Sequence, residues 1–386
     1  PMTEKPHLFR PLELRGEIVR NRIVVSPMCQ YSAHEGYMND WHLVHLGRFA
    51  TGGAGLIFAE ATAVQKNGRI THGCAGLWED GQIAGHAAAC HFMSLHGALP
   101  AIQLAHAGRK AGMQRPWFGN AVLTEADFAR GDMPWTPVGP TAEPMDEGWP
   151  APHPLSPSEI VQLVEDFAAA ARRAVAAGYR AIEVHGAHGY LIHSFLSPLS
   201  NRRNDAYGGD LRGRMRLALE VTEAVRAAIP EDLPLFFRTS SVDGAPEGWT
   251  LEDTVALAGA LKPLGVDVID CSSGGIAGPA TVAGGRKRQP GWQVPYAAEV
   301  RAKTGLMTQA VGLVTHPVQA EEILAAGAAD LIALGREMLL EPLWAHRAAA
   351  ELGHDAAFET WPEQYGWWLS RGDATSEYWR PSEAAE

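Results

Sequence analysis

The sequence predicts an α/β protein built as a (β/α)8 (TIM) barrel, in which eight parallel strands close on themselves inside a ring of helices. Short β-branched runs alternate along the chain with longer stretches of helical period that are rich in Ala, Leu and Glu. The strand-like runs are apolar throughout, as strands covered on both faces require. A Gly-x-Gly-x-x-Gly turn between a strand and a helix is missing from the sequence, which disfavours an open, doubly wound sheet.

Each predicted strand is bounded by glycine, proline or polar residues and is followed by a predicted helix. The strands are expected at Arg22–Ser26, Gly55–Ala61, Leu99–Leu104, Ala181–His185, Pro234–Arg238, Val266–Cys271, Met307–Val311 and Asp330–Leu334. The helices are expected at Trp41–Thr51, Gly81–His96, Ser158–Ala177, Leu211–Ile229, Leu251–Leu264, Tyr296–Lys303, Pro317–Ala326 and Pro342–Glu351. Capping residues mark several ends, such as Ser156 before one helix and Gly178 after it. Eight such units in succession predict the closed barrel.

The length of 386 residues corresponds to roughly two or three typical domains. The strand count instead predicts one barrel domain over residues 1–386, enlarged by two segments. The first, here called the excursion, is residues 112–154 between the third strand and its helix; it holds eight prolines and three tryptophans and is expected to form a lid or binding loop. The second, the aromatic tail, is residues 355–386, with Trp361, Tyr365, Trp367, Trp368, Tyr378 and Trp379. The tail is expected to pack on the barrel or on a neighbouring subunit, which favours a homodimer or homotetramer.

Composition limits the classes of partner and site. The formal net charge is −12 and the sequence has no basic stripe, so nucleic acid and anionic membranes are disfavoured as partners. The four cysteines are far apart in sequence, which argues against a disulfide framework, a structural zinc site and an iron–sulfur cluster. An apolar signal core and a run of about eighteen apolar residues are both missing from the sequence. We therefore expect a soluble, cytoplasmic protein.

In a (β/α)8 barrel the chemistry occurs at the carboxyl ends of the strands. The residues at or just after these ends, from the first strand to the eighth, are as follows: Cys29 and Tyr31; Ala61; Gln103 and His106; His185, His188 and Tyr190; Arg238; Cys271 to Gly275; Gly312; and Gly335 with Arg336. The last three residues follow strands seven and eight, where such barrels commonly bind phosphate. Glycine lets backbone N–H groups approach phosphate, and arginine offers a planar fork of donors. The alternative is that Gly335 only turns the chain and Arg336 makes a surface ion pair.

The end of strand four carries the most reactive side chains. His185 and His188 can hold a carbonyl oxygen and stabilise negative charge that develops on it. Tyr190, with an ordinary pKa of about 10, is a weak acid suited to protonating an enolate. The His-x-x-His spacing also suits a metal, but no strand-end carboxylate completes such a site. A Schiff-base aldolase is disfavoured because none of the predicted strands contains a lysine.

These groups cannot donate a hydride, so a phosphorylated redox cofactor is needed. Its ring is expected where Cys29, Ala61, Gln103 and Arg238 converge. Gln103 can donate to and accept from the pyrimidine edge of a flavin, and Arg238 would stabilise its reduced, anionic form. The residues thus favour a flavin barrel.

Six runs then extend this interpretation: SPMCQYS (26–32), EATAV (60–64), QLAHAGRK (103–110), HGAHGYLIHSFLSPLSNRR (185–203), YGG (207–209) and LGRE (334–337). In this order they resemble the Old Yellow Enzyme family of FMN-dependent ene-reductases, from about residue 7 to residue 350. A cysteine at position 29, in place of threonine, resembles the thermophilic-like subgroup that includes xenobiotic reductases. One departure is Ala206, where the family usually has glutamate.

The resemblance implies roles for individual residues. It implies FMN contacts from Ser26, Pro27, Met28, Cys29, Ala61, Gln103, Arg238, Gly335 and Arg336, with Cys29 near the N5/O4 edge. It implies that His185 and His188 hold the substrate carbonyl, that Tyr31 lines the pocket and that Tyr190 delivers a proton. NADPH, or else NADH, would reduce the flavin and leave before the substrate enters. Trp367 or Trp368 could reach a neighbouring subunit's pocket.

The expected function is therefore reduction of an electron-poor alkene or a nitro compound. Enones, maleimides, nitro compounds and nitrate esters all suit an oxygen clamp beside a reduced flavin. Three alternatives stay open. A dienoyl reductase with an iron–sulfur centre is disfavoured by the scattered cysteines, and a hydroxy-acid oxidase would need a different His/Arg arrangement. A flavin-binding barrel without turnover would bind FMN but fail to oxidise NADPH when given an enone.

Overall fold

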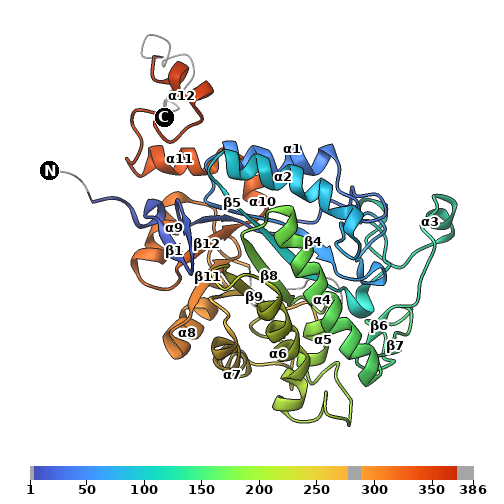
Figure 1. Cartoon of the computed structure of the whole chain (residues 1–386). Helices are drawn as coiled ribbons and strands as arrows, with labels where there is room; N and C mark the ends of the chain where they lie inside the picture. The colour runs from blue at the N-terminus through green and yellow to red at the C-terminus, as the bar shows by residue number, and fades with distance from the viewer. Residues whose placement is uncertain (1–3, 277–287, 372–386) are drawn as a thin grey trace.

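A computed structural model of the chain describes residues 4–276 and 288–371. Its centre is a closed barrel of eight parallel strands in the order β10-β11-β12-β3-β4-β5-β8-β9 (Figure 1). The strands are β3 (Ile23–Val25), β4 (Leu56–Ala63), β5 (Leu99–Ala105), β8 (Ala181–Gly186), β9 (Leu235–Ser240), β10 (Val268–Ser272), β11 (Met307–Val311) and β12 (Leu331–Leu334). The predicted (β/α)8 barrel is confirmed, and each expected strand is present with an end shifted by a few residues at most.

The eight predicted helices also form and surround the barrel. They are α1 (Asp40–Thr51), α2 (Ile83–Leu95), α4 (Pro157–Ala177), α6 (Leu211–Ala228), α7 (Leu251–Leu261), α8 (Val294–Thr304), α9 (Pro317–Ala325) and α11 (Trp344–Glu351). The predicted caps are in place: Ser156 accepts from the Glu159 N–H at the start of α4, and Gly178 ends α4 in the left-handed region at φ 106°. The apolar core has two parts, one inside the barrel and one between the strands and the surrounding helices. Inside the barrel, Phe58 contacts Phe236 edge to face.

A short hairpin that the sequence did not predict closes one end of the barrel. Its strands are β1 (Leu12–Leu14) and β2 (Glu17–Val19), which pair antiparallel. Leu12, Leu14 and Val19 are buried and belong to the same apolar cluster as the barrel interior. The hairpin therefore plugs the amino-terminal end of the strands and leaves the carboxyl ends for the site.

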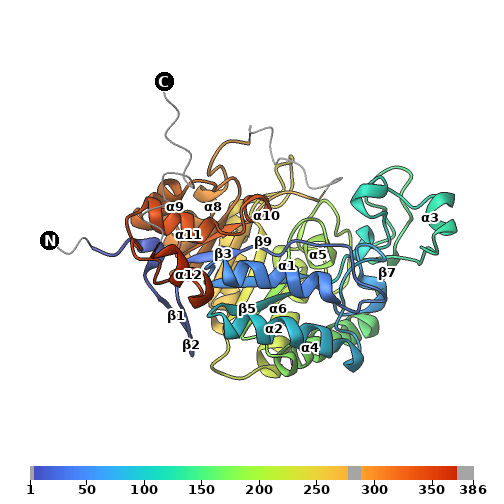
Figure 2. The same cartoon turned by 90° about the horizontal axis from the view of Figure 1, so that it is seen from above.

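The excursion and the tail lie on opposite sides of the barrel (Figures 1 and 2). The excursion carries α3 (Glu125–Ala129) and a two-strand pair, β6 (Val138–Gly139) with β7 (His153–Pro154). The described part of the tail contains α12 (Glu363–Leu369), and Trp361 stacks on His346 of α11 at 4.1 Å between ring centroids. Two further short helices, α5 (Leu191–Leu196) and α10 (Arg336–Leu340), follow β8 and β12. The predicted aromatic residues Tyr378 and Trp379 lie outside the described residues.

Candidate functional site

A cavity of about 610 Å³ opens at the carboxyl ends of the strands. Its lining comes from β3, β9, β10, β11 and β12 and from the loops that follow them. It includes Ser26, Pro27, Met28, His188, Arg238, Ser272, Gly312, Gly335 and Arg336. Seven of the ten residues predicted to bind the cofactor thus face one cavity, although they come from distant parts of the chain.

The predicted phosphate corner is formed by the ends of β11 and β12. Gly312 has φ 110°, and a Cβ there would come within 2.5 Å of Gln293 Nε2. Gly335 begins α10 beside the cavity, where the first backbone N–H groups of a helix lack helical partners. Within residues 4–276 and 288–371, the Arg336 side chain makes no hydrogen bond or ion pair, so the surface ion pair considered from the sequence is not formed. Its guanidinium is available to an anion in this corner.

Arg238 lies at the base of the cavity within a buried charged cluster. Its Nε donates to Asp270 Oδ2 at 2.7 Å and lies 3.6 Å from Glu183 Oε1. Gln103 Nε2 donates to Glu183 Oε1 at 2.8 Å. Burial raises the pKa of Glu183 well above its usual range, and the charge of Asp270 raises it further. Burial opposes the charge on Arg238, but the two carboxyl groups outweigh it and raise the pKa of Arg238. Burial and Asp270 therefore disfavour the charged form of Glu183, whereas the charge on Arg238 is favoured.

These residues fit FMN. Arg238 Nη2 is buried and has no partner among the described residues, although a guanidinium of this kind normally bonds with each of its N–H groups. An N1–O2 flavin edge would accept from it. Glycines and a free arginine form the phosphate corner, so both ends of the cofactor have matching groups. Cys29, Ala61 and Gln103 do not line this cavity; Gln103 adjoins Arg238 through Glu183.

Cys29 and Ala61 instead belong to a second, apolar group at the barrel mouth. Its buried members are Ala61, Ile70, Cys74, Ala105, Ala107 and Ala111, and Cys29, Tyr31, Met113, Trp135 and Tyr190 pack against them. Most of the buried side chains are small, which leaves room for a flat molecule. The aromatic side chains of Tyr31, Trp135 and Tyr190 pack against this buried group. Met113 and Trp135 belong to the excursion, so part of the excursion packs over the predicted substrate side.

The predicted oxygen clamp is brought together at the end of β8. The ring centroids of His185 and His188 are 5.3 Å apart, and those of His185 and Tyr190 are 5.2 Å apart. The Ala187 N–H donates to His185 Nδ1 at 3.3 Å, which places the His185 proton on Nε2. Ser272 Oγ lies 2.6 Å from His188 Nε2, and where the Ser272 hydroxyl is the donor the His188 proton is on Nδ1. His185 Nε2–H is thus free for a ligand oxygen, and His188 Nδ1–H is free in that tautomer.

Burial, assisted by the charge of Arg238, lowers the pKa of His185 well below its usual range. Burial and the neighbouring His185 do the same for His188. Both rings are therefore neutral at pH 7. Burial raises the pKa of Tyr190, so its phenol keeps its proton until a strong base meets it.

Lys110, to which the sequence pattern assigned no role, contacts this clamp. Its Nζ donates to His188 O at 2.7 Å and to Gly275 O, and it lies 5.4 Å from the centre of the Tyr190 ring. Burial lowers the pKa of Lys110 to about 7. Lys110 belongs to the QLAHAGRK run, so its position in a long motif was the available signal.

Tyr31 and the tryptophans of the excursion meet at the rim. Tyr31 has φ 52°, and its ring meets Trp117 edge to face at 5.8 Å. Trp135 packs on His72 at 4.8 Å and donates from Nε1 to Asn67 O at 2.9 Å. Trp117 is 59% exposed, whereas Trp135 is half-buried.

Two predicted strand-end residues have structural surroundings. His106 is buried, accepts from the Gly108 N–H at 3.0 Å and lies 3.1 Å from Gln65 Oε1. Cys271 is buried against the barrel wall, with its thiol directed to Ile269 O at 3.7 Å. Within the described ranges, no group of three or more His, Cys, Asp or Glu side chains is placed to hold a metal ion.

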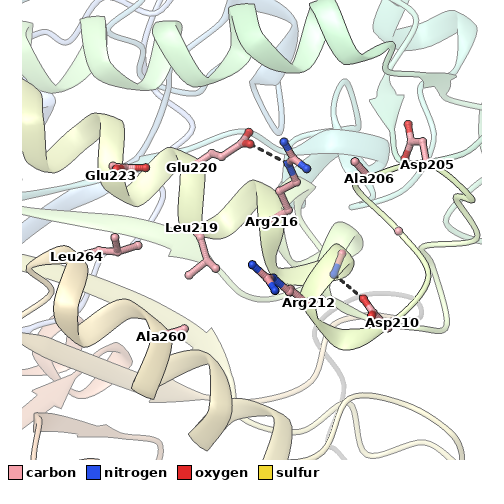
Figure 3. Close-up of a pocket in the computed structure, with 12 residues that line it drawn as sticks. Asp205, Ala206, Asp210, Arg212, Arg216, Leu219, Glu220, Glu223, Ala260 and Leu264 are labelled. Carbon is pink, nitrogen blue, oxygen red and sulfur yellow. Dashed lines mark hydrogen bonds and ion pairs between the residues drawn. The ribbon is translucent and has the colours of Figure 1, made fainter.

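A larger cavity of about 890 Å³ lies on the outer surface between α6 and α7 (Figure 3). Its lining is mixed, with Arg216 paired to Glu220 at 2.9 Å and Asp210 capping α6 beside the apolar Leu219 and Leu264. It contains none of the residues predicted to act in catalysis and does not reach the strand ends.

Comparisons with known proteins agree with this geometry. The model of the NADH:flavin oxidoreductase / NADH oxidase family matches residues 7–355. An NADPH dehydrogenase of Geobacillus sp. (strain WCH70) is 44% identical over 348 residues, which cover 90% of this chain and 94% of the relative. An NADPH dehydrogenase of Bacillus licheniformis is 44% identical over 347 residues, with 89% and 94% covered.

Solved structures give the same fold. Morphinone reductase superposes with a TM-score of 0.74 at 26% identity, covering 92% of this chain and 91% of its own. A 2-naphthoyl-CoA reductase superposes with a TM-score of 0.79 at 23% identity over 89% of this chain and 52% of its own, a likeness in fold alone.

Proposed function

The chain belongs to the NADH:flavin oxidoreductase / NADH oxidase family and is an FMN-dependent NADPH oxidoreductase, and on this premise we propose that it reduces the C=C bond of α,β-unsaturated carbonyl and nitro compounds. The resemblance to Old Yellow Enzyme and the expected use of FMN are confirmed at the level of the family. One observation carries the proposal: two neutral imidazoles and a protonated phenol meet at the end of β8 beside the cavity that fits FMN.

The two imidazoles bind and polarise the substrate. The His185 Nε2–H and the His188 Nδ1–H donate to one carbonyl or nitro oxygen, and these bonds strengthen as negative charge grows there. Neutral donors suit this role, because they hold the oxygen without protonating it. FMN held in the cavity by Arg238 and the Gly312, Gly335 and Arg336 corner would supply the hydride for the β-carbon of the substrate, with NADPH as its source.

Tyr190 completes the addition by delivering a proton to the α-carbon from the opposite face. Its pKa is raised by burial, so it transfers a proton only to a strong base such as an enolate. Tyr31 lines the substrate side, and Cys29 adjoins the flavin edge and tunes its potential. Ser26, Pro27, Met28, Ala61, Gln103, Arg238, Gly312, Gly335 and Arg336 hold the cofactor in this proposal.

The test supplies purified, FMN-loaded protein with NADPH and cyclohex-2-enone under anaerobic conditions. We expect equimolar NADPH oxidation and cyclohexanone formation, and loss of most product formation in His185→Ala with FMN still bound. A matched control is His86→Gln, because His86 is equally buried but bonds to Tyr179 in the barrel wall. The proposal is wrong if NADPH reduces the flavin while the enone is recovered unchanged. Reduction of a nitroalkene at its nitro group, with the alkene intact, would favour the nitro-reductase alternative.

We also infer self-association through the tail, and a location in the cytoplasm. Tyr365 and Trp367 are each 51% exposed and Trp368 is 70% exposed, so among the described residues α12 presents an aromatic surface to solvent. Within the described residues, no helix is long and apolar enough to span a membrane. Light scattering of wild type and of Trp368→Ala tests the association; a wild-type monomer contradicts it.

A further inference from the structure

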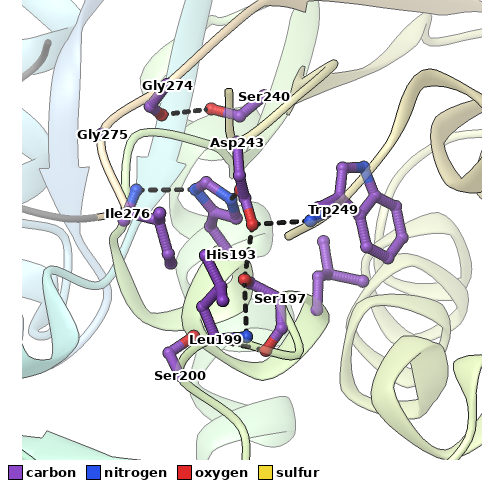
Figure 4. Close-up of polar contacts among 12 residues, drawn as sticks. His193, Ser197, Leu199, Ser200, Ser240, Asp243, Trp249, Gly274, Gly275 and Ile276 are labelled. Atoms are coloured by element: carbon purple, nitrogen blue, oxygen red, sulfur yellow. Dashed lines mark hydrogen bonds and ion pairs between the residues drawn. The ribbon is translucent and has the colours of Figure 1, made fainter. Parts of the chain in front are cut away.

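A buried hydrogen-bonded chain contacts the turn that carries His188, and Figure 4 shows its members His193, Asp243, Ser197 and Trp249. The Gly189 N–H donates to His193 Nδ1 at 2.7 Å, and His193 Nε2 lies 2.7 Å from Asp243 Oδ1. The two side chains are 1% and 0% exposed. They come from α5 and from the loop after β9, and neither is part of the proposed clamp.

The remaining oxygen of Asp243 is also fully used. Asp243 Oδ2 accepts from Ser197 Oγ at 2.6 Å and from the Trp249 N–H at 2.7 Å. Burial opposes ionisation of Asp243, but these hydrogen bonds and the one from His193 outweigh it, so the pKa of Asp243 lies below its usual range. Asp243 is therefore an ionised carboxylate fixed by three donors.

This arrangement sets the tautomer of His193. Its Nδ1 accepts the proton of the Gly189 amide, so Nδ1 carries no hydrogen, and the single imidazole proton is on Nε2, directed to Asp243. A carboxylate partner of this kind is a common way to fix the orientation of an imidazole. Asp243 thus keeps His193 ready to accept the Gly189 N–H.

The turn above needs such support because its backbone is strained. His188 has φ 62° and Gly189 has φ 73°, so two consecutive residues are left-handed and one of them carries a side chain. The same turn is held from two other directions. The His188 N–H donates to Ser240 Oγ at 3.0 Å, and Lys110 donates to His188 O at 2.7 Å. The His193 contact is the one that holds the Gly189 amide between the clamp histidine and Tyr190.

We propose that His193 and Asp243 are positioning residues of the oxygen clamp, which hold the His188–Gly189 turn left-handed so that His188 stands beside His185 and Tyr190. The inference rests on the proposed function, since it assumes that the clamp binds an oxygen ligand. Neither residue touches that ligand. Their contribution is to keep the imidazole of His188 in position before a ligand arrives, which lowers the free-energy cost of binding.

Two conservative replacements separate the two bonds of His193. In His193→Asn the side-chain Oδ1 can take the place of Nδ1 and accept the Gly189 N–H, but the bond to Asp243 is lost. In His193→Gln the side-chain Nε2 can donate to Asp243, but the acceptor for Gly189 is lost. The assay titrates 4-hydroxybenzaldehyde into FMN-loaded protein and follows the change in flavin absorbance, and thermal unfolding is measured in parallel. Amide hydrogen exchange at Gly189 reports the turn without any turnover.

We expect His193→Gln to raise the Kd for 4-hydroxybenzaldehyde about tenfold or more and to speed exchange at Gly189, with a loss of thermal stability no larger than that of His193→Asn. We expect the opposite pattern for His193→Asn: a Kd within about threefold of wild type and a clear loss of thermal stability, because Asp243 loses a donor. His86→Gln, the control buried histidine, should leave the Kd unchanged. The proposal is overturned if both His193 variants lose affinity in step with stability, or if neither changes the Kd. Wild-type protein that binds no phenol and reduces no enone would instead overturn the proposed function.

Discussion

Replacing Gly275 by alanine should push the His188 turn out of place. Gly275 follows β10 with φ 94°, and its carbonyl oxygen accepts from Lys110. A Cβ at this position would lie 2.6 Å from both Cα and the carbonyl carbon of His188. These are backbone atoms of a buried turn, so no flexible side chain can move aside to make room.

The magnitude follows from two separate effects. The left-handed backbone costs alanine about 1–2 kcal/mol relative to glycine. Ordinary contact begins near 3.4 Å, so the 2.6 Å approach requires the two backbones to separate by several tenths of an ångström. Overpacking of this kind costs about 1–3 kcal/mol. The expected loss in free energy of unfolding for Gly275→Ala is therefore about 2–5 kcal/mol.

A matched control isolates the steric effect. Gly209 has φ 83°, and a Cβ there meets nothing within 4 Å, so Gly209→Ala carries the backbone cost alone. Urea unfolding of FMN-loaded protein should show a loss of about 1–2 kcal/mol for this control. Titration with 4-hydroxybenzaldehyde should show weaker binding for Gly275→Ala and unchanged binding for Gly209→Ala. Equal destabilisation of the two variants, with equal Kd values, would refute the argument that Gly275 is needed for close approach to His188.

Three other predictions concern Tyr190, Cys29 and His86. Tyr190→Phe should slow enone reduction by roughly 10²–10⁴, the range for loss of a general acid, and slow flavin reduction by NADPH far less; stopped-flow traces that slow equally in both half-reactions would exclude Tyr190 as the acid. Cys29→Ala should shift the flavin potential in a redox titration with FMN still bound, and loss of FMN would contradict its role as a tuning residue. Burial lowers the pKa of His86 to about 4 in the folded protein. In the unfolded chain the pKa is about 6.5, so His86 binds a proton more tightly there and protonation favours unfolding. The stability due to neutral His86 is complete above about pH 6.5 and falls as the pH drops towards 4, by about 2 kcal/mol at pH 5. His86→Gln should flatten the unfolding free energy between pH 7 and pH 5 by about that amount, and an unchanged slope would count against a buried neutral His86.

The barrel could be predicted because its strands and helices differ in pattern. Parallel strands covered on both faces are continuous apolar runs. The helices between them show apolar residues at helical spacing and capping residues at their ends, as α4 does with Ser156 and Gly178. The β1–β2 hairpin was missed because each strand has three residues, too few to show alternation. Its burial depends on the barrel end that it closes, which is a tertiary contact. The fold of the excursion was likewise not predictable, since its two-residue strands pair across 14 intervening positions.

The site could be predicted as far as the strand ends could be located. Its cofactor side was found because seven predicted residues line one cavity. Ser240 and Asp243 were missed because strand five was predicted to end at Arg238, whereas β9 continues to Ser240. His193 was missed although it stands in a recognised run, because its role depends on a tautomer that only the contacts with Gly189 and Asp243 define.

The buried carboxylates show most clearly why sequence order hides part of a barrel site. Glu183 and Asp270 are single acids inside apolar strands, and each would be costly to bury alone. The parallel register resolves this cost, because Asp270 is paired with Arg238 across β9 and β10, and Gln103 with Glu183 across β5 and β8. Asp270 pairs with Arg238 at 2.7 Å, and burial together with Asp270 raises the pKa of Glu183. The cluster thus holds a cationic arginine in the barrel centre while Nη2 stays without a protein partner among the described residues. An arginine with a fixed counter-ion and one free donor is what an electron-accepting ring needs at the edge where negative charge collects, and only the register between strands far apart in sequence could place it there.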